Sequence, residues 1–196
     1  MVRNCGSLSI AILMRIQYFI PSDNSTAVNY GQGDLEVTFS RGYKRQSFIV
    51  DGGFESFFCP SQDPQDICWT ESDTNWVGTD SPGGHWDTLI FSHQPYAFAG
   101  HSVATFGSGD GSDSFPGTLT VAQPLNTVAG TAYTLQGFFF TGFNDASQEV
   151  NASLDVNWNG NTIATVQNIG SSWTLQQFQV TAKGNDILSF HGGEPF

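Results

Sequence analysis

The chain has few basic residues. Only six of its 196 residues are Lys or Arg, whereas eighteen are Asp or Glu, and the formal net charge is −12. A surface this negative repels phosphate backbones and anionic lipid headgroups. The composition therefore argues against nucleic acid and membrane surfaces as partners, and it leaves neutral or cationic partners.

Long apolar runs are also missing. No stretch reaches the roughly 18 apolar residues that a membrane-spanning helix needs, so no membrane span is predicted. The run SLSIAILM at residues 7–14 resembles a secretory h-region, but Arg15 ends it and no clear small-x-small cleavage site follows. A signal peptide is therefore the less favoured interpretation of this run.

Cysteine is scarce, with three residues in the chain. Cys59 and Cys68 flank a short polar loop, and a bridge between them would contribute about 2–3 kcal/mol by closing a small ring. Two free buried thiols are the alternative, since no second pair completes a zinc site. The disulfide is the favoured interpretation, and it predicts a secreted or cell-surface location. Cys5 is left over.

Catalytic motifs are absent. The sequence has no GxSxG, no HExxH and no P-loop lysine. His85, His93 and His101 recur every eight residues, but Pro95 and Gly100 interrupt any strand that would align them as metal ligands. A glycoside hydrolase needs two carboxylates about 5–10 Å apart, and no pair among the many acids stands out. We therefore predict no catalytic residues and keep a hydrolase as the weakest alternative.

Glycine and phenylalanine are abundant, at 22 and 17 residues, which suits a β-rich protein with many turns. In residues 151–166, apolar residues alternate with polar ones up to Asn159-Gly160, a pair typical of a type I′ hairpin turn. No stretch has the 3.6-residue period of a long helix. Further strands are expected at 101–108, 117–125, 131–140, 174–182 and 186–190.

These strands predict an antiparallel β-sandwich. Residues 57–98 are rich in Pro, Gly and Asp and are expected to form long loops that carry aromatic residues. Five of the six basic residues precede residue 46, whereas fifteen of the eighteen acids follow Ile49. This change predicts a boundary, with residues 1–48 a leader or extended N-terminal segment and residues 49–196 the sandwich domain.

Loop aromatics indicate a sugar-binding surface. A pyranose presents an apolar C–H face and a rim of hydroxyls, so its site needs flat rings beside polar side chains. The candidate carbohydrate-binding residues are Trp76, Trp86, Tyr96, Asn75, Asp87 and Gln94. The alternative is that these aromatics close the ends of the core, which would leave a structural or adhesive domain. Trp158 and Trp173, at strand positions, are expected in the core.

Four phrases in order carry a family resemblance: VDGGFES, DSFPGTLTVAQPLNTVAGTAYTL, LDVNWNGNTIATV and SSWTLQQFQVTAKGNDILSF. Together they resemble the galactose-binding-domain-like jelly rolls of secreted carbohydrate-binding modules, over residues 50–190. The resemblance implies a non-catalytic module that binds a polysaccharide or other glycan. It also implies a structural calcium held partly by Glu55, and no other cofactor. The chain departs from the family at its end, where FHGGEPF replaces the usual final strand and its late Asp.

Overall fold

The computed structural model describes residues 10–14, 48–57, 59, 68–93, 97–107, 116–141, 153–167 and 169–193. These residues form two antiparallel β-sheets and contain no helix, so none of them forms a helix able to cross a membrane. The strands of the six-stranded sheet are, in spatial order, β10 (Thr174–Thr181), β7 (Ala132–Thr141), β1 (Ile10–Met14), β5 (Ser102–Phe106), β4 (Thr88–Ser92) and β2 (Cys68–Thr70). Those of the five-stranded sheet are β3 (Trp76–Thr79), β6 (Thr118–Val121), β11 (Leu188–Gly192), β8 (Ser153–Trp158) and β9 (Asn161–Gln167).

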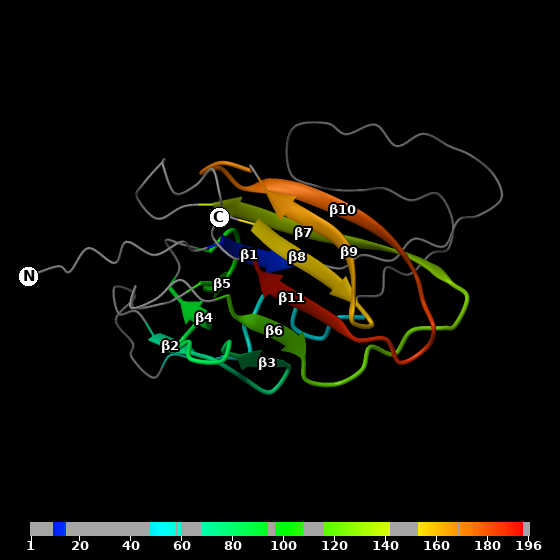
Figure 1. The fold of residues 1–196 in the computed structure, drawn as a ribbon, viewed down its shortest axis with the longest axis horizontal. Coiled ribbons are helices and arrows are strands. Elements are labelled where there is room, and N and C mark those ends of the chain that lie inside the picture. Colours follow the sequence, from blue (N-terminus) through cyan, green and yellow to red (C-terminus); the bar gives the residue numbers. More distant parts are fainter. Residues whose placement is uncertain are drawn as a thin grey trace, which may run out of the picture.

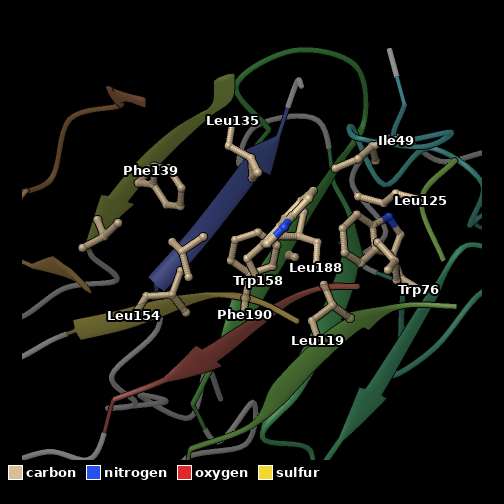
Figure 2. Close-up of a cluster of buried hydrophobic side chains, with 14 of the residues drawn as sticks. Ile49, Trp76, Leu119, Leu125, Leu135, Phe139, Leu154, Trp158, Leu188 and Phe190 are labelled. Atoms are coloured by element: carbon tan, nitrogen blue, oxygen red, sulfur yellow. The ribbon is translucent and has the colours of Figure 1, made fainter. Parts of the chain in front are cut away.

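The two sheets face each other across one hydrophobic core. Strand β8 shows how the sequence builds it, because Leu154, Val156 and Trp158 alternate with polar residues and are all buried. Leu135 and Phe139 of β7 meet this cluster from the six-stranded sheet (Figure 2). The arrangement is that of a β-sandwich, and the prediction of an all-β antiparallel fold is confirmed.

The hairpin predicted at Asn159-Gly160 is also confirmed. Both residues have positive φ, 54° and 74°, as a type I′ turn requires, and β8 pairs with β9 on either side of them. The other expected strands are found as β5, β6, β7, β10 and β11, with ends shifted by a few residues.

The expectation of long loops over residues 57–98 is wrong. Three short strands, β2, β3 and β4, lie in this range. Strand β4 pairs with β5 along its full length, from Thr88 opposite Phe106 to Ser92 opposite Ser102. Turn-forming residues separate these strands at short intervals, so the sequence pattern does not reveal strands of only three to five residues.

The N-terminal run contributes to the sandwich. Residues IAILM form β1, which lies inside the six-stranded sheet and pairs antiparallel with both β5 and β7 (Figure 1, blue). The predicted boundary near residue 48 therefore does not separate the sheet from everything that precedes it. The charge change marks a difference in composition, whereas strand pairing joins the two parts.

Candidate functional site

Trp76 lies in the core, and its prediction as a sugar platform is wrong. Its side chain is 0% exposed (Figure 2) and packs against Phe54 and Phe190, with ring centroids 5.2 and 6.2 Å away. The indole N–H donates a 2.7 Å hydrogen bond to the carbonyl of Asp51. A buried tryptophan with its one donor satisfied has no ring face left for a ligand.

The opening phrase VDGGFES forms the turn that holds Trp76. The Asp51 carboxylate accepts hydrogen bonds from the backbone N–H groups of Glu55 (2.7 Å) and Ser56 (2.9 Å). Phe54 has a φ of 61°, a strained value for a non-glycine residue, and its ring is fully buried. Asn75 donates from Nδ2 to the Ser56 hydroxyl at 2.5 Å, so it braces the same turn.

Glu55 links this turn to the start of β5. Its Oε1 accepts the backbone N–H groups of His101 (2.8 Å) and Ser102 (3.1 Å), and its Oε2 lies 3.3 Å from Nδ1 of His101. Calcium requires six to eight oxygen ligands, whereas the groups around this carboxylate are donors. The described residues contain no group of three His, Cys, Asp or Glu side chains that could hold a metal ion. The residues present around Glu55 do not fit a calcium ion.

Asp87 is the organising carboxylate of the loop between β3 and β4. Its side chain is fully buried and accepts backbone N–H groups from Ser81 and His85, each at 3.1 Å. A Cβ added at Gly84 would lie 1.8 Å from Oδ2 of Asp87, so a side chain at this position would displace the carboxylate. The prediction that Asp87 contacts a sugar is therefore wrong, and the residue acts by shaping the loop.

The same loop holds Trp86 at the surface. Trp86 is 37% exposed and has a φ of 57°, a backbone region that bulky residues rarely occupy. The Asp80 carboxylate supports this conformation by accepting the backbone N–H groups of Trp86 (3.3 Å) and Asp87 (2.9 Å). Such strain persists only where the surroundings enforce it, and it is concentrated at functional sites.

Trp69 of β2 lies beside Trp86. Trp69 is 48% exposed, and the two indole centroids are 6.4 Å apart with an interplanar angle of 65°. Phe91 lies 6.3 Å from Trp69, and the His85 ring lies 4.3 Å from Trp86. We call Trp69, Trp86, Phe91 and His85 the aromatic surface, and Asp80 supplies a carboxylate at its margin.

Sequence reasoning found one half of this indole pair and missed the other. Trp69 was among the aromatics expected in loops, but it was not a candidate, because the pairing of β2 with β4 was not foreseen. The register places Trp69 directly opposite Phe91, and this contact marks the aromatic surface. The candidates Gln94 and Tyr96 lie outside the described residues.

Compared with protein-family models, with curated proteins and with solved structures, the chain matches none.

The predicted disulfide is confirmed and lies next to the aromatic surface. Cys59 and Cys68 are bridged, with Cα atoms 5.5 Å apart. Cys68 is the first residue of β2 and immediately precedes Trp69. Because β2 is an edge strand of three residues, the covalent link restrains the strand that carries one of the two indoles.

A second aromatic cluster lies on the same outer face of the six-stranded sheet, at β7, toward the edge opposite β2. Phe98 stacks on Phe138 with centroids 3.9 Å apart, and Trp173 lies 5.6 Å from Phe98 and 4.3 Å from Phe140. Trp173 was expected in the core, but it is half-buried on this outer cluster, because it precedes β10 and does not belong to the strand. Trp158 is in the core as predicted.

Proposed function

We propose that the protein is a non-catalytic, extracellular carbohydrate-binding module of the jelly-roll, galactose-binding-like type, and that glycan stacks on the aromatic surface. The observation that carries this proposal is the exposed pair of indoles, Trp69 and Trp86. A strained, hydrogen-bonded loop fixes one indole and a disulfide restrains the strand of the other. Ordering the rings before binding reduces the entropy that the ligand must offset.

The chemistry of the surface fits a neutral sugar. Each indole can cover about 50 Å² of a pyranose C–H face, which stabilises the complex by about 1 kcal/mol. His85 and Asp80 are exposed beside the rings and offer donors and acceptors to hydroxyl groups. Two rings with a few hydrogen bonds give dissociation constants from about 1 mM to about 1 μM. The net charge of −12 does not oppose a neutral polysaccharide.

The carboxylates near the rings favour binding over catalysis. Asp80 and Asp87 are the acids of the loop, and both accept backbone N–H groups that hold it in shape. A glycosidase acid or base has to exchange protons with substrate. Since both carboxylates already accept these backbone N–H groups, we assign them the role of structural support for Trp86.

Intrinsic tryptophan fluorescence tests the proposal directly. The full chain is titrated with a panel of neutral soluble polysaccharides, and Trp69→Ala and Trp86→Ala are compared with wild type. We expect a saturable shift in wild type and at least a tenfold loss of affinity in each variant. Leu175→Ala is the matched control, because Leu175 is exposed on β10, at the opposite edge of the same sheet from β2. It should leave the affinity unchanged.

Other outcomes point to the alternative functions. A folded protein that shows no shift with any glycan would overturn the proposal and favour a structural or adhesive surface domain. Release of reducing ends from a polysaccharide, lost on Asp80→Asn, would instead identify a glycoside hydrolase. A shift that persists in both tryptophan variants would place the sugar site elsewhere on the molecule.

A further inference from the structure

Strand β1 lies between β5 and β7 and pairs with both, in a position that the same strand of another chain could fill. It pairs antiparallel with β7 from Ile10 opposite Thr141 to Met14 opposite Gly137, and with β5 from Ile10 opposite Phe106 to Ile12 opposite Ala104. We call the space between β5 and β7 the acceptor slot. Without β1, both bordering strands would present unpaired backbone groups to water, and an exposed strand edge readily pairs with another chain.

The connection from β1 to the rest of the sandwich is long. Thirty-three residues, 15–47, separate Met14 from Phe48, and fully extended they would reach up to about 110 Å. A folded domain of this length has a diameter of only about 40 Å. The covalent connection therefore does not determine whether β1 enters the slot of its own chain or that of a neighbour.

Charge matches β1 and its flanking residues to a sandwich of this chain's own composition. Arg3 and Arg15 flank β1, and five of the six basic residues lie before residue 46. The chain from Ile49 onward carries fifteen acidic residues against the single Lys183. The N-terminal segment is thus attracted to the acidic sandwich, whether that sandwich belongs to the same molecule or to another copy.

We propose that copies of this protein join by strand exchange, in which β1 of one chain fills the acceptor slot of another. Reciprocal exchange gives a closed dimer, and head-to-tail exchange gives a linear chain of molecules. A tether of this length gives the strand an effective concentration on the order of 1 mM at its own slot. The ratio of exchanged to self-inserted strands should therefore rise about 100-fold between 10 μM and 1 mM protein.

Cysteine trapping tests the exchange. Ala11 lies directly opposite Thr105, and antiparallel partners have Cα separations of about 4.5–5.5 Å, which a disulfide can bridge. One full-length chain carries Cys5→Ser and Ala11→Cys, and the other carries Cys5→Ser and Thr105→Cys. The two are refolded together at 10 μM and at 1 mM without reductant and are then mildly oxidised. Non-reducing electrophoresis and mass spectrometry detect the mixed disulfide.

We expect a mixed disulfide whose yield rises with concentration. A chain with Cys5→Ser, Ala11→Cys and Thr105→Cys should close on itself at 10 μM. A chain with Cys5→Ser and Thr165→Cys controls for disulfides that form by random collision, because Thr165 lies on β9 of the other sheet. It should form no mixed disulfide with the Ala11→Cys chain. Closure within the triple variant with no mixed disulfide at 1 mM overturns the proposal. Failure of the triple variant to close also overturns it, because β1 would then not occupy the slot.

Discussion

The buried carboxylate of Asp186 joins three connections of the sandwich, and its removal offers a strict test of the fold. One oxygen accepts the Thr127 hydroxyl and the other accepts Nδ2 of Asn159 in the hairpin turn. The backbone N–H groups of Lys183 (3.0 Å) and Gly184 (3.2 Å) also donate to it. We predict that Asp186→Ala strongly destabilises the protein.

The magnitude follows from the donors left without an acceptor. Breaking a buried network around a charged group costs about 3–5 kcal/mol, since each stranded donor keeps its desolvation penalty. For a chain of about 200 residues, each kcal/mol lowers the Tm by about 2–4 °C. The Tm of Asp186→Ala should therefore fall by about 10 °C. The fall is smaller the further the loops relax around the missing carboxylate.

The destabilisation caused by Asp186→Ala should depend on pH. Burial by itself raises the pKa of Asp186, but the hydrogen bonds from Thr127, Asn159, Lys183 and Gly184 outweigh it, and the net pKa is lowered. A lowered pKa in the folded state contributes stability above the unfolded-state pKa of about 4, and this stability is lost as pH falls through the folded value. The difference between wild type and Asp186→Ala should be largest at neutral pH and should shrink in acid.

Urea denaturation followed by circular dichroism at pH 7 and at pH 3 measures both effects. Asp155→Ala is the control, because Asp155 accepts one exposed hydrogen bond from Thr165 (2.6 Å) and should cost less than about 1 kcal/mol. The reasoning fails if Asp186→Ala stays within about 0.5 kcal/mol of wild type at pH 7. It also fails if the difference is the same at both pH values.

Three further predictions follow from the site. Trp76→Ala should lower the free energy of unfolding by about 3–5 kcal/mol in urea denaturation, and a small change would place this ring outside the core. Gly84→Ala should weaken glycan binding by roughly tenfold in the fluorescence titration, because the new Cβ displaces Asp87 and with it Trp86, and unchanged affinity would refute that coupling. Reduction of Cys59–Cys68 should cost about 2–3 kcal/mol of stability, measured by denaturation with and without reductant.

The sequence predicted those parts of the fold in which local signals agree. Around Asn159-Gly160, alternation, turn chemistry and strand length all indicate one hairpin, and the structure has it. Strand β1 could not be predicted in the same way. A short apolar run has no intrinsic partner, and its pairing with β5 and β7 depends on contacts about 90 to 130 residues away in the sequence.

The site was predicted in part for a similar reason. Sequence composition placed aromatics near one another in residues 57–98, but burial depends on which face of a strand a residue occupies. Trp76 begins β3 opposite Val121 of the core, whereas Trp69 on β2 is opposite Phe91 and points away from the core. A shift of one residue in strand register moves a side chain from one face of a sheet to the other, and so decides whether a tryptophan is buried or exposed. Only the strand pairing, which is a long-range property, decides between them.

The chemistry of the two outer faces explains why the aromatic surface lies where it does. An antiparallel sheet usually turns a polar face to water, and the five-stranded sheet does so with Thr118 hydrogen-bonded to His191. The six-stranded sheet does not, because Trp69, Phe91 and Val103 form one cross-strand row on its outer side. Val103 is fully buried although it lies outside the core between the sheets, so other parts of the chain cover the middle of this row. Trp69 is an uncovered end of a second apolar layer, and that packed layer would hold the ring rigid for the glycan of the proposed function.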